Sequence, residues 1–467
     1  MELPITISGV QEGLLEKKFN AQGLVKSYFE RIKKYNPDLN SFITVTEDLA
    51  FSQASKVDEE IRNKGKLAYK EKSLLGTVVA LKDLYSTKGI RTTASSKVLN
   101  EYVPAFSATV VKKLMDAGCI LIGKTNCDAW AHGGSGENSD FGPSKNPWNK
   151  EYVPGGSSSG SGVAVAADLA TFAMGTDTGG SVRCPASFCN LTGLKPTYGV
   201  VSRFGVIAMA SSLDTVGHLT RTVEDSRKIF SVVKGKDNYD STVIETKPEK
   251  KSSKFRIGIP KEYFVKGIDS EVEKLVMDAA NVFKKENIEL LQISLPHTKY
   301  AISVYYIVCP AEVSSNLARF DGIRYGEKRN AFGDEAKRRI MLGTYVLSAG
   351  YYDAYYLKAM KVRSKIIEDF DNAFKKVDAI IAPVSPTPPF KIGEKVNDPL
   401  KMYLADVFTV AANLAGIPAL AIPAGFTKSG LPVGFQLLGP RFSEDALFKL
   451  GEKYQTKTDW HLKKPNI

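Results

Sequence analysis

Two short segments rich in glycine and serine carry the side chains best suited to chemistry. Residues 155–162 read GGSSSGSG, and residues 175–183 read GTDTGGSVR. Residues this small let a backbone approach a bound group closely, and they leave many N–H groups free to donate hydrogen bonds. The two segments therefore predict a functional site, and three kinds of chemistry compete for it.

The first two kinds of chemistry fit poorly. A phosphate-binding loop needs GxxxxGK[ST], and Gly155 and Gly160 have that spacing but no lysine follows. A nucleophile elbow, GxSxG, would make Ser158 the nucleophile and would need His218 or His297 as its base. In a block of glycine and serine alone, that match carries little weight. A flexible linker would explain the block, but apolar segments flank it closely on both sides.

The third kind of chemistry is a Ser–Ser–Lys arrangement. Ser181 would be the nucleophile, Ser157 would relay its proton, and Lys82 would be the base. Backbone N–H groups beside the nucleophile would form an oxyanion hole for charge that develops in the transition state, and the candidates are Thr178, Gly179 and Gly180.

Lys82 can serve as a base only when its amine is neutral. Its reference pKa is about 10.4, and bringing it near 7 costs on the order of 4 kcal/mol, through burial or a nearby positive charge. The apolar run VVAL at 78–81 predicts that Lys82 ends a buried strand. Asp83 follows directly, but adjacent strand residues point to opposite faces. We therefore expect no ion pair between Lys82 and Asp83.

The elements that must position these residues alternate between helix and strand. Apolar periodicity predicts helices over 12–36, 47–64, 107–117, 163–170 and 269–286. Short apolar runs predict strands over 75–82, 119–122, 171–176, 255–259, 378–383 and 418–424. This alternation indicates an α/β sheet. The polar, lysine-rich residues 236–254 are the predicted flexible boundary or insertion.

Composition narrows the classes of protein. Lys and Arg number 63 against 51 Asp and Glu, and the resulting charge of +12 is compatible with acidic partners without identifying one. Five cysteines without a CxxC motif, and four histidines without an HxH or HxxxH pair, predict neither a disulfide framework nor a metal site. No apolar run reaches the roughly 18 residues of a membrane-spanning helix.

Residues 155–197, together with VVALKDLYSTKGIRTTASS at 78–96, resemble the amidase signature family. The resemblance implies one amidase domain over 1–467, with its core at about 70–230 and its C-terminal part at 255–467. It implies a mixed, mostly parallel twisted sheet with helices on both faces. It also implies Lys82, Ser157 and Ser181 as the catalytic set, with a cis peptide bond before the middle serine.

Four stretches outside that signature are similar to one branch of the family, the A subunits of glutamyl-tRNA(Gln) amidotransferases: 201–225, 314–326, 336–359 and 412–425. This similarity implies that glutamine is hydrolysed to supply ammonia for converting Glu-tRNA(Gln) to Gln-tRNA(Gln). It implies glutamine binding by Tyr305, Arg339 and Asp406, with Tyr306 as a rival to Tyr305. A free-standing amidase acting on a small amide, or a non-catalytic scaffold, are the alternatives.

The same similarity implies partners. A B subunit would bind the tRNA, and a small subunit would wrap around the pair. No cofactor or metal is expected in this chain, whereas ATP and Mg²⁺ are expected at the partner subunit. Residues 327–334 are shorter than in bacterial members, and the chain ends soon after a lysine-rich stretch, which predicts altered subunit contacts. The Tyr- and Lys-rich composition favours the mitochondrial matrix, with a bacterial cytoplasm as the alternative.

Overall fold

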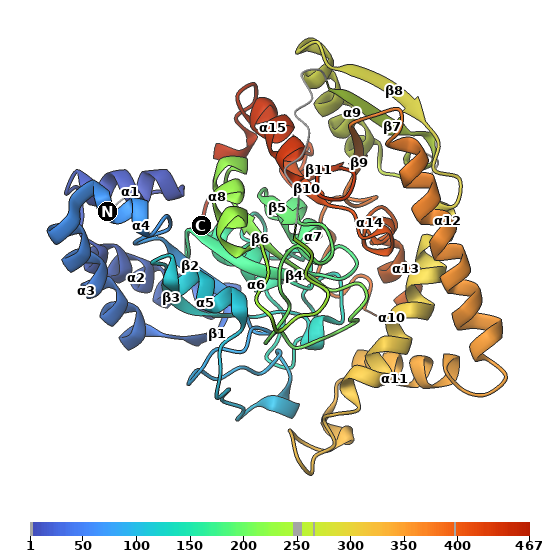
Figure 1. Cartoon of the computed structure of the whole chain (residues 1–467), viewed down its shortest axis with the longest axis horizontal. Coiled ribbons are helices and arrows are strands. Elements are labelled where there is room, and N and C mark those ends of the chain that lie inside the picture. The colour runs from blue at the N-terminus through green and yellow to red at the C-terminus, as the bar shows by residue number, and fades with distance from the viewer. Residues whose placement is uncertain (1–2, 246–254, 265–266, 397) are drawn as a thin grey trace.

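One large sheet forms the centre of the molecule (Figure 1). The computed structural model describes residues 3–245, 255–264, 267–396 and 398–467. Within them eleven strands are ordered β1-β3-β2-β4-β6-β5-β10-β11-β9-β7-β8. Their bounds are β1 Phe42–Val45, β2 Val78–Lys82, β3 Ile120–Thr125, β4 Phe172–Asp177, β5 Thr192–Lys195, β6 Thr215–Thr220, β7 Arg256–Pro260, β8 Glu289–Ile293, β9 Ala379–Pro383, β10 Ala419–Phe426 and β11 Pro432–Leu438.

Helices cover both faces of this sheet. Their bounds are α1 Ile7–Leu15, α2 Ala21–Leu39, α3 Glu47–Lys64, α4 Ala68–Glu71, α5 Thr109–Asp116, α6 Ser159–Ala166, α7 Arg183–Phe188, α8 Val223–Val233, α9 Ser270–Lys285, α10 Ala301–Leu317, α11 Asp334–Val346, α12 Lys358–Ala373, α13 Pro399–Leu404, α14 Val410–Ala415 and α15 Glu444–Gln455. Strand β2 shows how the faces are divided, since successive side chains alternate. Val78 and Ala80 pack with α2, α3 and α6, whereas Val79 and Leu81 pack with α5, α8 and α15.

The predicted α/β fold with a mixed sheet is confirmed, but the expectation of mostly parallel strands is wrong. Six of the ten neighbouring pairs in the described sheet are antiparallel. One reason is the β10–β11 hairpin, in which a short turn forces the chain to reverse. Another is β6, which lies antiparallel between β4 and β5.

Two predicted helices differ from those observed. The predicted helix 12–36 is two helices, α1 and α2, because Lys17 has a φ of 57° and the Asn20 side chain caps α2 by accepting a hydrogen bond from the Gly23 N–H. The predicted helix 163–170 instead begins at Ser159, inside the glycine–serine block, and ends at Ala166. The predicted helix 47–64 coincides with α3.

The sheet contains strands from both the predicted core and the C-terminal part of the chain, as a single domain would require. The predicted boundary at 236–254 is described only to residue 245. In that described part Asp240 pairs with Arg203 at 2.9 Å. Residues 246–254 lie outside the described residues.

Candidate active site

Lys82 ends strand β2 on the face that α6 covers. Its Nζ donates hydrogen bonds to Oγ of Ser157 at 2.7 Å and to Oγ1 of Thr176 at 2.8 Å. The side chain is fully buried. The strand therefore holds an amine against the serine that the sequence predicts as its partner.

No acid pairs with Lys82 in the described part of the chain. Asp83 instead lies 3.2 Å from Nζ of Lys124 and accepts hydrogen bonds from the N–H and hydroxyl of Thr93. Burial lowers the pKa of Lys82 to about 8, because the buried ammonium loses its hydration. Both expectations for this lysine, burial and separation from Asp83, are met by the geometry.

Ser157 is held at the start of the first glycine–serine segment. The peptide bond between Gly156 and Ser157 is cis, as the family resemblance implies. The Gly156 N–H donates to the carbonyl of Gly134 at 2.8 Å, and the Ser157 carbonyl accepts from the Asp128 N–H at 3.2 Å. These backbone contacts fix the serine in front of Lys82.

Ser181 lies in the second glycine–serine segment, between β4 and α7. Its side chain is 7% exposed, whereas Ser157 is completely buried. Its carbonyl accepts a hydrogen bond from the Ser158 N–H at 3.1 Å, so the two segments are joined through their backbones. No hydrogen bond links the hydroxyls of Ser157 and Ser181 in the described residues. The structure thus brings Lys82 onto Ser157 and sets Ser181 beside that segment.

The nucleophile-elbow interpretation is not supported, because neither candidate histidine forms a hydrogen bond with Ser158. The Ser158 hydroxyl is buried and donates to the Thr176 carbonyl at 3.2 Å. His218 contacts the Ser226 hydroxyl at 2.8 Å, and His297 contacts Asp369 at 2.9 Å. Both candidate bases therefore have other partners.

A buried ion pair that the sequence analysis does not predict supports the loop that carries Ser181. Asp177 accepts hydrogen bonds from the N–H groups of Gly180 and Val182, and its carboxylate pairs with Arg183 at 3.0 Å. Burial alone would raise the pKa of Asp177, but the Arg183 cation and its hydrogen bonds hold that pKa below the ordinary value. Both residues lie in the segment 175–183, so the sequence signal for this pair is an acid and a base six positions apart on either side of Ser181's glycines.

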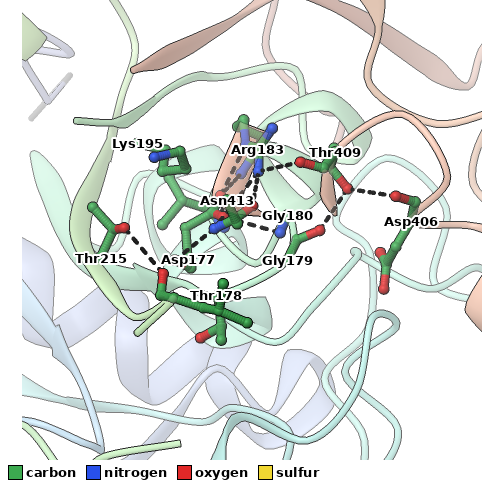
Figure 2. Close-up of polar contacts among 12 residues, drawn as sticks. Asp177, Thr178, Gly179, Gly180, Arg183, Lys195, Thr215, Asp406, Thr409 and Asn413 are labelled. Carbon is green, nitrogen blue, oxygen red and sulfur yellow. Dashed lines mark hydrogen bonds and ion pairs between the residues drawn. The ribbon is translucent and has the colours of Figure 1, made fainter. Parts of the chain in front are cut away.

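Arg183 extends this support to distant parts of the chain, as Figure 2 shows for Asn413 and Thr409. Its guanidinium donates to the Asn413 side chain at 2.6 Å, to the Thr409 carbonyl at 3.1 Å and to Gln436 at 2.8 Å. The Thr409 hydroxyl in turn donates to the Gly179 carbonyl at 2.6 Å. Residues of β11 and α14 therefore fix the loop before Ser181.

The predicted oxyanion donors are only partly available. The Gly180 N–H donates to Asp177 at 2.9 Å, which contradicts the expectation that it is free. The N–H groups of Gly179 and Ser181 make no hydrogen bond to any described residue. For Thr178, the third predicted donor, the hydroxyl donates to Asp214 at 2.7 Å, a contact that does not involve its backbone N–H. The backbone N–H groups of Gly179 and Ser181, on either side of Gly180, thus remain for a developing negative charge.

A cavity of about 420 Å³ has Arg339, Asp406 and Tyr306 in its wall, together with Gly134. Gly134 also accepts the hydrogen bond from Gly156, and a Cβ atom on it would lie 3.4 Å from the Asp406 carboxylate. The cavity therefore adjoins the segment of the cis serine.

The charges in this cavity are arranged for a ligand of mixed charge. Nε of Arg339 donates to Glu335 at 2.8 Å, and its guanidinium lies 5.5 Å from the centre of the Tyr306 ring. The Asp406 carboxylate has no hydrogen-bond partner among the described residues. Burial raises the pKa of Asp406 to about 7, and the Arg339 cation opposes that rise. A cation and an unpartnered acid thus share one cavity wall.

The two tyrosines lie in different places. Tyr306 lines the cavity and stacks on Tyr403 with ring centres 3.8 Å apart. Tyr305 is buried, and its phenol lies against Gly179, where a Cβ atom would come within 2.7 Å of the oxygen. The family similarity implies Tyr305, with Tyr306 as its rival; the structure places Tyr306 in the cavity wall and Tyr305 beside the nucleophile loop.

Comparisons with known proteins agree with the resemblance. The family model described as Amidase matches residues 23–448. The A subunit of the glutamyl-tRNA(Gln) amidotransferase of Carboxydothermus hydrogenoformans is 49% identical, covering 98% of both chains. The corresponding protein of Hahella chejuensis is 48% identical, over 100% of this chain and 99% of that one.

Solved structures show the same fold. The A subunit of the glutamyl-tRNA(Gln) amidotransferase of Thermotoga maritima is 38% identical with a TM-score of 0.83, covering 98% of this chain and 96% of that one. A structure described as an amidase has the same TM-score of 0.83 at 27% identity, covering 97% and 99% of the two chains. Backbone shape alone therefore does not separate these two kinds of protein, whereas sequence identity does.

Proposed function

This chain belongs to the amidase family, in the branch of glutamyl-tRNA(Gln) amidotransferase A subunits, and on that premise we propose that it hydrolyses the side-chain amide of glutamine. The ammonia released would convert Glu-tRNA(Gln) to Gln-tRNA(Gln) in a complex. One observation carries the catalytic part of the proposal: a buried lysine, with no acidic partner among the described residues, lies 2.7 Å from the hydroxyl of Ser157.

The reaction proceeds in two halves. Oγ of Ser181 attacks the carboxamide carbon of glutamine, and its proton passes through the Ser157 hydroxyl to the neutral amine of Lys82. The same proton then returns to the leaving nitrogen as the C–N bond breaks, so ammonia departs and a γ-glutamyl ester remains on Ser181. Water attacks that ester by the same relay, which releases glutamate and restores the serine.

The charge that develops on the carbonyl oxygen needs donors already in place. The N–H groups of Gly179 and Ser181 lie on either side of Gly180, make no hydrogen bond to any described residue and belong to the loop that the Asp177–Arg183 pair holds. Donors fixed before the reaction stabilise the transition state without a cost of reorientation. We assign the oxyanion hole to these two groups.

Glutamine fits the charges of the neighbouring cavity. Its α-carboxylate suits the guanidinium of Arg339, and its α-ammonium suits the carboxylate of Asp406. Tyr306 supplies an aromatic wall beside Arg339, and Tyr305 lies close enough to Gly179 to contact the amide end. A small neutral amide would leave the buried Asp406 carboxylate without a partner and Arg339 paired with Glu335 alone, which argues against the free-standing amidase.

Partners complete the proposed function. A B subunit would hold the tRNA and use ATP and Mg²⁺ to activate it, and a small subunit would wrap around the pair, while this chain needs no cofactor for the steps above. No helix in the described part of the chain is long and apolar enough to span a membrane. The reported relatives come from bacteria, so they support the bacterial cytoplasm and offer no support for the mitochondrial matrix.

A Ser181→Ala variant tests this proposal in the assembled complex. It should lose glutamine hydrolysis and glutamine-dependent amidation, because the nucleophile is gone. Amidation driven by added ammonium chloride should remain, since that step belongs to the partner. Full glutamine-dependent activity in the variant would refute the assignment, and so would hydrolysis of small neutral amides in preference to glutamine by the unaltered chain.

A further inference from the structure

His132 is a buried polar side chain in the wall of the cavity that contains Arg339 and Asp406. It is 1% exposed, and neither of its ring nitrogens has a hydrogen-bond partner among the described residues. An imidazole in this position has lost its hydrogen bonds to water without replacing them, which is unfavourable. A bound molecule in the cavity would supply the missing partner.

The backbone before His132 is held in an uncommon conformation. Trp130 and Ala131 have φ values of 59° and 63°, in the left-handed region that residues with a side chain rarely adopt. The His132 N–H donates to the Ala129 carbonyl at 2.9 Å, and the His132 carbonyl accepts from the Asn138 side chain at 2.9 Å. Hydrogen bonds made by both the N–H and the carbonyl of His132 therefore fix its backbone at the cavity.

The imidazole of His132 is neutral. Burial and then the Arg339 cation lower its pKa well below the ordinary value. A neutral imidazole keeps one N–H donor and one acceptor nitrogen.

Arg339 has an N–H group, free in the described part of the chain, that could bind the same ligand carboxylate as the ring N–H of His132. Its Nε is occupied by Glu335 at 2.8 Å and its Nη1 faces Sγ of Cys309 at 3.8 Å, whereas its Nη2 has no partner among the described residues. A carboxylate bound there presents a second oxygen to a neighbouring donor.

We propose that His132 is a substrate-binding residue whose ring N–H donates a hydrogen bond to the α-carboxylate of glutamine, beside Arg339. This inference rests on the proposed function, because it takes glutamine as the substrate. Asp406 would then bind the α-ammonium alone. Recognition of the carboxylate by a cation and a neutral donor makes the α-carboxylate a requirement for tight binding.

The test compares three variants of the full chain, each co-expressed with its partner subunits. His132→Phe removes both ring nitrogens and keeps a similar shape, so we expect the KM for glutamine to rise about tenfold while kcat changes less than twofold. His132→Asn retains an N–H donor and should recover part of that loss. His461→Phe is the matched control, because His461 is also buried with an unpartnered Nδ1 but lies outside the cavity.

A second substrate identifies the group that His132 contacts. With 4-aminobutanamide, which is glutamine without its carboxylate, His132→Phe should cause no further loss relative to the unaltered chain. An unchanged KM for glutamine in His132→Phe, or an equal loss with both substrates, would overturn the inference. A lowered thermal midpoint in His132→Phe alone would also overturn it by showing a structural role. Failure of the unaltered complex to hydrolyse glutamine would instead refute the proposed function.

Discussion

Asp83 follows Lys82 in the chain, but its carboxylate pairs with Lys124 at 3.2 Å, and no other acid in the described ranges pairs with the amine of Lys82. A paired Lys82 would stay protonated at neutral pH and could not accept a proton. Successive side chains of a strand point to opposite faces. Lys82 therefore faces Ser157, whereas Asp83 points away from it and pairs with Lys124.

The rate of glutamine hydrolysis should follow the deprotonation of Lys82. Burial lowers its pKa to about 8, and the neutral form is the active one, so kcat should rise with pH through about 8. At pH 7 about a tenth of the enzyme is active, and kcat should be about tenfold below the plateau above pH 9. Steady-state kinetics at saturating glutamine measure this.

A Lys82→Arg variant is the control for that pH profile, since a guanidinium stays charged throughout. It should lose about 10²- to 10⁴-fold in kcat at every pH. A wild-type kcat that stays flat between pH 6 and 9 would contradict the role of a neutral amine.

Binding of glutamine should depend on a different group, Asp406. Burial raises the pKa of this carboxyl to about 7, and only the ionised form attracts an ammonium. The KM for glutamine should therefore fall about tenfold as the pH rises from 6 to 8. In Asp406→Asn the KM should be about ten- to hundredfold higher and independent of pH, while the rise of kcat persists. A KM that keeps its pH dependence in the variant would exclude Asp406.

The Asp177–Arg183 pair should contribute strongly to stability. Replacing Arg183 by Met leaves a buried carboxylate without its cation, so unfolding should become easier by about 3–5 kcal/mol. Because the pKa of Asp177 is lowered on folding, this contribution should be present above about pH 4 and decline as the pH falls. Denaturant titration measures both effects.

Arg227→Met provides the comparison for Arg183. Arg227 pairs with Glu452 at 2.8 Å, but about a third of each side chain is exposed, so the loss should be at most about 1 kcal/mol. Equal losses of unfolding free energy in the two variants would mean that the buried pair contributes no more to stability than the exposed one.

Thr409 should affect catalysis without touching the reacting atoms. Its hydroxyl donates to the Gly179 carbonyl at 2.6 Å, and Thr409→Val removes that bond while keeping the shape. We expect kcat to fall about tenfold. In Thr427→Val the lost hydroxyl contacts Ser429 in the β10–β11 turn, and kcat should be unchanged. A Thr409→Val enzyme as fast as the unaltered one would show that the loop does not need this support.

The sequence alone predicts the catalytic residues that lie inside continuous motifs. Lys82 could be placed because an apolar run precedes it, and Ser157 and Ser181 because both lie in glycine–serine segments. Antiparallel neighbours such as β4 and β6 could not be found this way, since their pairing joins residues about forty positions apart. Periodicity also missed the break at Lys17, because one left-handed residue leaves the apolar pattern intact.

The site was predicted less completely than the fold for a related reason. Arg339 and Asp406 do share a cavity, but the choice between Tyr305 and Tyr306 depends on which face of α10 meets the loop. Gly180 was expected to donate to an oxyanion, and only the folded loop reveals that Asp177 takes its N–H. His132 gave no signal in the sequence, since a buried imidazole without a partner is visible only in three dimensions.

The hydrogen bonds that hold the loop of Ser181 from distant parts of the chain have a consequence for protein engineering. The segment 155–197 identifies the family, but the groups that hold Ser181 in position come from Thr409, Asn413 and Gln436, more than two hundred residues away. Grafting the segment onto another scaffold would transfer the serines without the residues that hold them in position. A chain split between β6 and β7 should regain turnover only when its two fragments reassemble.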